Sequence, residues 1–430
     1  MKKSTWRQLK RWLTSRRQEV PTVIPEREHA ISEADISPNA LSVLHRLQSL
    51  GYSAYLVGGS VRDLLLGQHP KDFDVATNAR PEEVRQVFRN SRLIGRRFRL
   101  VHVYFRHEIV EVSTFRANAE ESLKNPTFND TKGKRPAMLL QDNTFGTIEE
   151  DAWRRDFTIN ALYYHAADRT VIDYTGGVQD LRRRVVCIIG DPVQRFHEDP
   201  IRLLRAIRMA AKLDFKMETL THQAVGSLQS LLRHVPAARL FDEVIKLFFE
   251  GHTMAAYQQL QEAHYMHALF PDAMMDMAKS PIHERLILLA MEATDQRFTQ
   301  GQSLNPGFLF SVLLWPVVQH LMQEHLQQHK KWFPALHYGM VTALERQLKT
   351  LLIPRRLTMM MRSLWVLQYH LERRRANRIE HIFHQRYFRA AFDLLKLRQQ
   401  AGESVRDVLV WWDNFQRAES LERRRMIELL

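Results

Sequence analysis

The sequence predicts an α+β fold, in which an N-terminal head built on a small mixed β-sheet is followed by an all-helical neck, body and tail. Short apolar runs with strand-like alternation, separated by turn residues, occupy the first part of the chain. From Thr219 onward the periodicity is helical and turn signals are sparse. We therefore expect a basic extension and linker (1–38), a head (39–190), a neck (191–251) and a helical body and tail (252–430).

Composition points to a soluble protein with a polyanionic partner. The chain has 430 residues, 45% of them hydrophobic, which is ample for more than one domain. Lys and Arg number 62 against 48 Asp and Glu, and the net charge of +14 favours nucleic acid as a partner. The single Cys187 excludes an internal disulfide framework, and the longest apolar run, 308–318, is too short to cross a bilayer. We expect a cytoplasmic protein.

The first residues, MKKSTWRQLKRWLTSRR, are basic but lack the apolar stretch of a secretory signal. Trp6, Leu9, Trp12 and Leu13 would share one face of a helix. One interpretation is a basic amphipathic helix that contacts RNA, a membrane surface or a partner protein; the other is a frayed basic tail.

A strand, a tight turn and a helix are predicted in succession from Ala54. Residues 54–57 form a short apolar run, and Gly58, Gly59 and Ser60 break it and open a helix that ends before Gly67. Two glycines let the backbone approach a ligand closely, and the N–H groups at the start of a helix favour an anion such as a triphosphate. Ser60 could add a hydroxyl donor.

Two aspartates follow on the next predicted strand, 72–75. The strand period of two places Asp72 and Asp74 on one face and Phe73 on the other, towards the core. Two carboxylates on one face repel each other unless a cation lies between them, and oxygen ligands of this kind suit Mg²⁺. One Asp-x-Asp alone carries little weight, but its position directly after a Gly-Gly-Ser turn and a short helix is the layout of a nucleotidyltransferase site.

The segment after a predicted helix at 80–90 is strand-like and basic. Arg96, Arg97 and Arg99 are candidates for contacts with an RNA backbone, although arginines also protect the edge of a sheet from aggregation. Glu111, on a predicted strand at 108–115, could face the aspartates as a third carboxylate or could simply be exposed. Residues 118–149 are polar and without periodicity, as in a substrate-contacting loop or a disordered insert.

Several motifs together resemble one family. LVGGSVRDLLLG and PKDFDVAT look like the head of the template-independent nucleotidyltransferases that comprise bacterial poly(A) polymerases and bacterial and eukaryotic CCA-adding enzymes. RRDFTINAL, DYTGG and VPAARLFDEVIKLFFEG resemble later motifs of this family, so that the resemblance spans roughly residues 41–251. LIGRRFRLVHV looks like the segment that separates bacterial poly(A) polymerases from their CCA-adding relatives.

The resemblance implies roles for individual residues. Asp72 and Asp74, assisted by Asp156 or Glu111, would hold two Mg²⁺ ions. The remaining positions would bind the nucleotide, with the glycine turn and arginines at the phosphates and Asn160 at the ribose or a phosphate. These nucleotide-binding candidates are Gly58, Gly59, Ser60, Arg62, Arg154, Arg155 and Asn160.

A basic helix is predicted after Asp199 and Pro200, a cap followed by proline in the first turn. In the family, Glu-Asp-x-x-Arg at this place reads the base, which assigns that role to Asp199 and Arg202. Arg205 and Arg208 are rival nucleotide contacts, and an exposed basic stripe with a simple cap is the alternative for the whole set.

The predicted activity is transfer of AMP from ATP to RNA 3′ ends with release of pyrophosphate. CCA addition to tRNA is the alternative within the family, and a non-catalytic RNA-binding protein on this fold is an alternative of another class. Candidate partners are RNA decay factors such as a helicase, a nuclease or an RNA chaperone. Arginine runs at 355–356, 373–375 and 423–425, with Trp365, Trp411 and Trp412 nearby, could form a track for RNA or could be solvated helix faces over core tryptophans.

Overall fold

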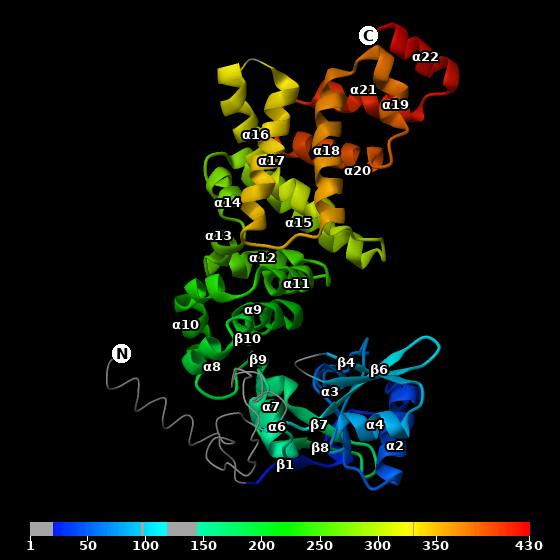
Figure 1. Cartoon of the computed structure of the whole chain (residues 1–430), viewed down its shortest axis with the longest axis vertical. Helices are drawn as coiled ribbons and strands as arrows, with labels where there is room; N and C mark the ends of the chain where they lie inside the picture. Colours follow the sequence, from blue (N-terminus) through cyan, green and yellow to red (C-terminus); the bar gives the residue numbers. More distant parts are fainter. Residues whose placement is uncertain (1–19, 96–98, 118–143, 330) are drawn as a thin grey trace, which may run out of the picture. The chain divides into compact units, whose positions relative to one another are not determined.

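The computed structural model describes residues 20–95, 99–117, 144–329 and 331–430. The chain separates into two compact units: one comprises residues up to 202 together with 214–224, and the other comprises 203–213 and 225–430. We refer to them as the head unit and the helical unit (Figure 1). Residues 1–19, for which the sequence allows a basic amphipathic helix or a frayed tail, lie outside the described residues, as do Arg96 and Arg97.

The head unit contains a mixed sheet with the strand order β1-β8-β7-β2-β3-β6-β5-β4. Neighbouring strands are antiparallel except β3 and β6, which are parallel. The strands are β1 Thr22–Ile24, β2 Ala54–Val57, β3 Asp74–Thr77, β4 Ser91–Ile94, β5 Leu100–Tyr104, β6 Ile109–Thr114, β7 Leu162–His165 and β8 Thr170–Asp173. The predicted small mixed sheet is confirmed.

Helices surround this sheet, and side-chain caps fix where several of them begin. The Ser37 hydroxyl accepts from two N–H groups at the start of α2, and Thr147 and Glu150 form a reciprocal capping box on α6. The helices are α2 Pro38–Ser49, α3 Gly59–Leu65, α4 Pro81–Val87, α6 Ile148–Arg154, α7 Gly177–Arg183 and α8 Pro192–Glu198, with 3₁₀ turns at Glu26–Glu28, Glu33–Asp35 and Thr158–Asn160. A small parallel pair, β9 Val185–Val186 and β10 Lys216–Met217, lies apart from the main sheet.

The predicted strand at 72–75 is partly wrong, because β3 begins at Asp74. Val57, the last residue of β2, pairs with Asp74, and the chain then turns at Gly58. Asp72 and Phe73 therefore lie beyond this ladder. Phe73 is still buried, as expected, and Asp72 is exposed. Asp72 is nevertheless close enough for its charge to act on Asp74.

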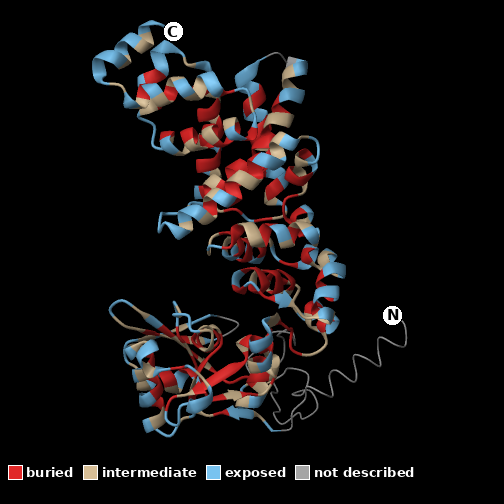
Figure 2. Cartoon of the chain, turned by 180° about the vertical axis from the view of Figure 1, so that it is seen from behind, coloured by how far each residue is buried: buried red, intermediate tan, exposed pale blue. Residues whose placement is uncertain are grey.

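The rest of the described chain is helical, apart from a 3₁₀ turn at Gln229–His234 and another at Ala376–Arg378. The buried residues form continuous cores between these helices (Figure 2). The helices are α9 Ile201–Leu213, α10 Thr219–Ser227, α11 Ala237–Phe248, α12 Thr253–Glu262, α13 Tyr265–Leu269, α14 Pro271–Met277, α15 Pro281–Thr299, α16 Pro306–His329, α17 Trp332–Leu348, α18 Arg355–Arg373, α19 Ile379–Phe383, α20 Phe388–Ala401, α21 Arg406–Arg417 and α22 Ser420–Glu428. Within the described ranges, none of the helices is both long and apolar enough to span a bilayer.

Two tryptophans of the suggested RNA track belong to the helical core. Trp365 and Trp412 are completely buried, and their indole N–H groups donate to the carbonyl oxygens of Ser311 and Leu371, each at 3.0 Å. Arg423 donates to the carbonyl of Phe415 at 3.0 Å. At Trp365 and Trp412 the structure therefore bears out the alternative of core tryptophans.

Candidate active site

The glycine turn between β2 and α3 requires glycine at its first position. Gly58 has φ of 78° and ψ of −131°, a conformation that side chains with a Cβ rarely adopt. Its N–H donates to the carbonyl of Leu162 on β7, which ties the turn to the sheet at 3.3 Å. The Ser60 hydroxyl donates to the carbonyl of Val57 at 3.1 Å, so in this structure it stabilises the turn.

Two arginines lie against the glycines. A Cβ on Gly58 would lie 3.6 Å from Nη1 of Arg155, and a Cβ on Gly59 would lie 3.5 Å from Nη2 of Arg62. Arg62 is buried and donates to Asn160 Oδ1 at 2.6 Å and to Asp63 Oδ1 at 2.8 Å. The turn therefore carries positive charge close to its backbone, which is the environment that a phosphate needs.

The carboxylates lie on the neighbouring strands. Asp74 on β3 is the register partner of Glu111 on β6, and Glu111 is in turn opposite His102 on β5, with 3.4 Å between Oε2 and Nε2. The pKa of Asp74 is raised to about 6: burial is the largest cause, Glu111 and Asp72 add to it, and Arg155 and His102 oppose it. Ionised carboxylates at this place repel each other, so the site favours a cation.

This arrangement fits a divalent cation that shares its ligands with a substrate. Among the residues that the structure describes, no group of three or more His, Cys, Asp or Glu side chains is arranged as a ready-made metal cage. Mg²⁺ is commonly held by one or two carboxylates while waters and substrate phosphates complete its coordination. The exposed Asp72 and the half-buried Asp74, near a cationic turn, match that chemistry.

Arg155 is held in place by a buried network. Its Nε and Nη2 donate to Asp151 Oδ2 at 3.2 and 2.9 Å, and Nε also donates to the Tyr163 hydroxyl at 3.1 Å. The Tyr163 hydroxyl donates to the same Asp151 oxygen at 2.8 Å. Burial alone would lower the pKa of Arg155, but Tyr163 and Asp151 outweigh it and raise that pKa, so the guanidinium stays charged.

More positive charge gathers at the same carboxylate. Burial lowers the pKa of Arg154 to about 10; Asp151 opposes the shift, and Arg116 and Arg155 add to it. Arg116 is buried directly after β6, and its N–H donates to Asp151 Oδ1 at 3.3 Å. The contact from Arg116 to Asp151 is made by its backbone, while the charges of Arg116 and Arg155 both act on Arg154 near this single buried aspartate. This excess of positive charge suits a polyphosphate.

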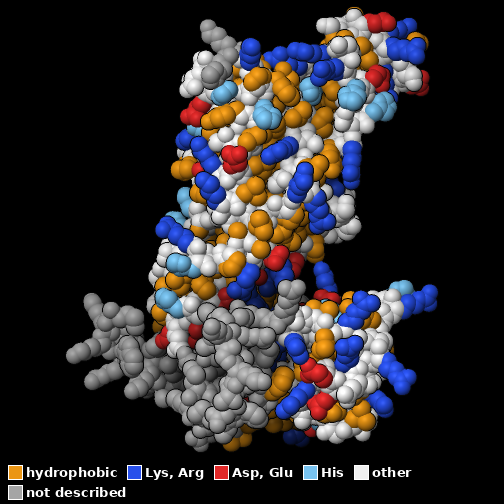
Figure 3. Space-filling model, in the orientation of Figure 1, with side chains coloured by type: hydrophobic (Ala, Val, Ile, Leu, Met, Phe, Trp, Pro, Cys, Tyr) orange, Lys and Arg blue, Asp and Glu red, His pale blue; other side chains and the backbone are white. Residues whose placement is uncertain are grey.

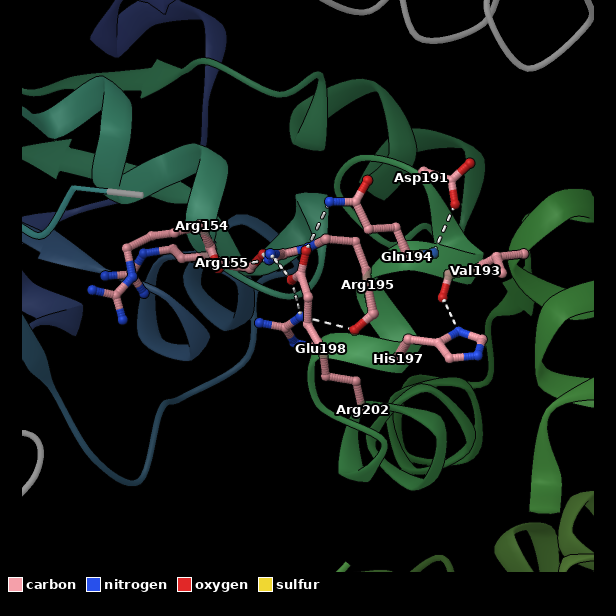
Figure 4. Close-up of polar contacts among 9 residues, drawn as sticks. All are labelled: Arg154, Arg155, Asp191, Val193, Gln194, Arg195, His197, Glu198 and Arg202. Atoms are coloured by element: carbon pink, nitrogen blue, oxygen red, sulfur yellow. Dashed lines mark hydrogen bonds and ion pairs between the residues drawn. The ribbon is translucent and has the colours of Figure 1, made fainter. Parts of the chain in front are cut away.

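Asp156 lies on the other side of the RRD motif, next to α8. Its Oδ1 accepts from the N–H of Phe157 at 2.8 Å. Burial, with Arg202, lowers the pKa of Arg195, and Glu198 and then Asp156 oppose this shift. Arg195 Nη2 donates to the carbonyls of Arg154 and Arg155 at 2.7 and 2.6 Å, as Figure 4 shows. Arg195 therefore caps the chain segment that carries the two predicted phosphate arginines.

The predicted base-reading residues follow α8. Asp199 is the C-cap of α8, and its carbonyl accepts from the N–H of Arg202. Arg202 donates to the Arg195 carbonyl at 2.9 Å and to Glu198 Oε2 at 3.0 Å (Figure 4). Its guanidinium is thus held near Arg195 within the head unit.

The two rival nucleotide contacts belong to the helical unit. Arg208 forms an ion pair with the buried Glu243 at 2.6 Å, while Arg205 lies on the same helix at intermediate burial. Arg99, the described member of the basic strand, pairs with Glu82 at 2.7 Å on the surface. The structure thus brings together the glycine turn, Arg62, Asn160, Arg155 and the carboxylates, with Arg154 near Arg155. Asp156 lies with Arg195 in the same unit, whereas Arg205 and Arg208 belong to the helical unit.

Sequence reasoning missed Arg116, Asp151, Tyr163 and Arg195. Arg116 could have been noticed because it follows the strand that carries Glu111. The other three contact the motif only because α6, β7 and α8 pack together, and no local sequence pattern predicts this packing.

Three stretches of the chain match models of known protein families. Residues 54–187 match the family model described as the poly A polymerase head domain. Residues 214–277 match the model described as a probable RNA and SrmB-binding site of polymerase A, and residues 328–430 match the one described as the polymerase A arginine-rich C-terminus.

Relatives cover different shares of the chain. Poly(A) polymerase I of Salmonella typhi is 46% identical over 414 residues, covering 95% of this chain and 89% of the relative. The CCA-adding enzyme of Lactobacillus helveticus is 37% identical over 52% of this chain and 53% of the relative. The solved structure of the Thermotoga maritima CCA-adding enzyme complexed with tRNA has a TM-score of 0.59 at 18% identity, covering 93% of this chain and 87% of that chain, which shows a shared fold.

Proposed function

The chain belongs to the poly(A) polymerase family of nucleotidyltransferases, and from this premise we propose how it acts. It transfers AMP from ATP to the 3′ hydroxyl of RNA without a template. The 3′ oxygen forms a bond to the α-phosphorus while the bond between that phosphorus and the bridging oxygen breaks. Pyrophosphate leaves, and the hydroxyl proton is released.

The position of Arg155 is the observation that carries this proposal. Its guanidinium lies against Gly58 and also acts on the charge of Asp74, so the phosphate turn and the carboxylates form one site. Asp151 and Tyr163 fix the guanidinium before any substrate arrives, which spares the reorganisation that a mobile arginine would need. Arg62, held by Asn160, adds a second fixed charge at the turn.

Asp72, Asp74 and Glu111 are the residues that would hold Mg²⁺. When bound, two Mg²⁺ ions would lower the pKa of the attacking hydroxyl and neutralise charge on the triphosphate and the leaving pyrophosphate. Asp74 has to lose its proton for this role, and because its pKa is raised to about 6, protons compete with the metal for this carboxylate near that pH.

The remaining predicted roles rest on the resemblance. We propose that Asp156 supports the ribose or the metal from its place beside Arg195, and that Asp199 and Arg202 contribute to base choice with Arg205 or Arg208 as rivals. The division into head, neck, body and tail is proposed on the same ground. We also propose a cytoplasmic location, and cooperation with RNA decay factors or contact of the N-terminal extension with a membrane remains a prediction.

CCA addition is the alternative that the relatives support less well. The poly(A) polymerase relative matches 95% of the chain, whereas the CCA-adding relative matches 52% of it. This difference in coverage favours polyadenylation over CCA addition.

A transfer assay with aspartate variants tests the site. Asp72→Ala and Asp74→Ala should each reduce AMP transfer to labelled oligo(A) by roughly 10²-fold or more, since each removes a ligand worth several kcal/mol in the transition state. Asp407→Ala, which alters an exposed aspartate on α21, should leave the rate unchanged. Near-normal turnover in either site variant would overturn the assignment, and retained ATP binding without any turnover in the unmodified protein would support a non-catalytic protein.

A further inference from the structure

Exposed aromatic rings and an arginine lie in contact where α17 begins and α18 ends. Trp332 and Phe333 are 43% and 48% exposed. The guanidinium carbon of Arg373 lies 5.4 Å from the ring centre of Trp332 and 4.8 Å from that of Tyr369. Phe333 meets Tyr369 edge to face, with 5.9 Å between ring centres. Rings and guanidinium therefore form one continuous surface within the helical unit.

More arginines extend this surface into the turn after α18. Arg375 and Arg378 are exposed, and after burial their charges are the next contributions that lower the pKa of His370, beside Tyr369. Figure 3 shows Lys and Arg side chains gathered with hydrophobic ones over the α16–α17 turn and the end of α18. We call this set the aromatic-arginine patch: Trp332, Phe333, Tyr369, Arg373, Arg375 and Arg378.

Acidic side chains on the same segments are engaged elsewhere. Glu372 lies 2.7 Å from Nη1 of the buried Arg398. Glu380 lies 3.7 Å from Nδ1 of His384. The patch therefore keeps a positive charge that neighbouring carboxylates do not cancel.

The helical unit buries other tryptophans, so a lack of core does not explain why these rings are exposed. Trp365, on the same helix as Arg373, is completely buried and hydrogen-bonded, as is Trp412. Leaving a large ring in water forgoes the stabilisation that burial would give, and adjacent exposed rings are typical of interaction sites. The chain thus packs other tryptophans well and presents Trp332 and Phe333 to solvent.

We propose that the aromatic-arginine patch binds single-stranded RNA upstream of its 3′ end, with bases stacked on Trp332 and Phe333 and phosphates at Arg373, Arg375 and Arg378. Only the identity of the ligand rests on the proposed function. Stacking accepts any base because every base has a π-face, so this surface would hold a growing adenylate tail as well as the original transcript. An acidic protein would use the arginines but would not need two exposed rings beside them.

A direct binding experiment tests the patch. Binding of a labelled 15-nucleotide oligo(A) to the full chain is measured by fluorescence anisotropy in the absence of ATP. Trp332→Ala should weaken binding about tenfold, as expected for the loss of one stacked base, and Trp332→Phe should bind nearly normally. Arg378→Ala should lower the slope of log affinity against log salt by about 0.7, the value for one phosphate contact on a single strand. Arg285→Ala removes the same charge from an exposed position on α15 and should leave both quantities unchanged.

A transfer assay separates failure of this inference from failure of the proposed function. Trp332→Ala should raise the KM for RNA about tenfold and leave the KM for ATP unchanged. An active enzyme whose patch variants bind RNA as the unmodified chain does would overturn the patch and leave the function standing. An acidic polypeptide of matched charge that competes as well as RNA, with equal sensitivity to Trp332→Ala, would assign the patch to a protein partner instead.

Discussion

The ionised form of Asp74 should lower the stability of the head unit, and the substitution Asp74→Asn should show this effect. At 1.36 kcal/mol for each pH unit, the distance between an ordinary aspartate pKa of 3.8 and the value of about 6 in the fold corresponds to roughly 3 kcal/mol. Because the pKa of Asp74 is raised in the folded state, the stability that the protonated side chain contributes is fully present below pH 3.8 and is lost as the pH rises through about 6. Asparagine carries no charge and avoids this loss.

The expected difference depends on pH in a defined way. Without Mg²⁺, Asp74→Asn should be more stable than the unmodified chain by roughly 3 kcal/mol at pH 8, by about half of that at pH 5, and by almost nothing near pH 3.5. Hydrogen exchange of peptides that contain β3 and β6 reports this locally, and 3 kcal/mol corresponds to exchange slowed about 10²-fold. Comparing both proteins at one pH cancels the intrinsic exchange rate.

Two controls make this result specific. Asp72→Asn alters an exposed aspartate and should change protection by no more than about 0.5 kcal/mol. Mg²⁺ with ATP should protect β3 in the unmodified chain and not in Asp74→Asn. Equal protection of the two proteins at pH 8, or a difference that is the same at pH 5 and pH 8, would refute the argument that repulsion and burial raise the pKa of Asp74.

Two further predictions concern the groups around the phosphates. Tyr163→Phe removes a hydroxyl bonded to Arg155 and should raise the KM for ATP about tenfold, as expected for a hydrogen bond to a charged group. Tyr164→Phe is its control, because the Tyr164 hydroxyl has no hydrogen-bond partner among the described residues; equal effects in steady-state kinetics would contradict the network. Gly58→Ala and Gly67→Ala each place a side chain at positive φ, at a cost of roughly 1–2 kcal/mol. In calorimetric ATP titrations only Gly58→Ala should lose affinity, because a Cβ there meets Arg155 whereas Gly67 faces open space; unaltered affinity would remove the turn from the site.

Local patterns were enough to predict the β2-turn-α3 unit. The apolar run, the glycines and the helix period are all encoded within a dozen residues, and β2 was found at 54–57 as predicted. The start of β3 was misplaced because the alternation at 72–75 continues beyond the point where β2 can pair with it. Pairing partners, rather than periodicity, decided that boundary.

The buried charges could not be predicted in the same way. Arg154 and Arg155 are adjacent in the sequence, yet Asp151 and Tyr163 hold Arg155 while burial lowers the pKa of Arg154. Those partners come from α6 and β7, so their role depends on how the helix packs on the sheet. Likewise, the sequence pattern of an arginine run beside tryptophans is the same whether the rings are buried, as Trp365 is, or exposed.

Nucleotide choice is the property that tests polyadenylation most directly. The purified chain with Mg²⁺ should be incubated with each single nucleoside triphosphate, and with CTP plus ATP, on an unstructured oligo(A) and on a tRNA without its CCA end. Long ladders from ATP alone on oligo(A) are the predicted result. Addition of three nucleotides to the tRNA followed by a stop, without extension of oligo(A), would contradict polyadenylation and identify a CCA-adding enzyme.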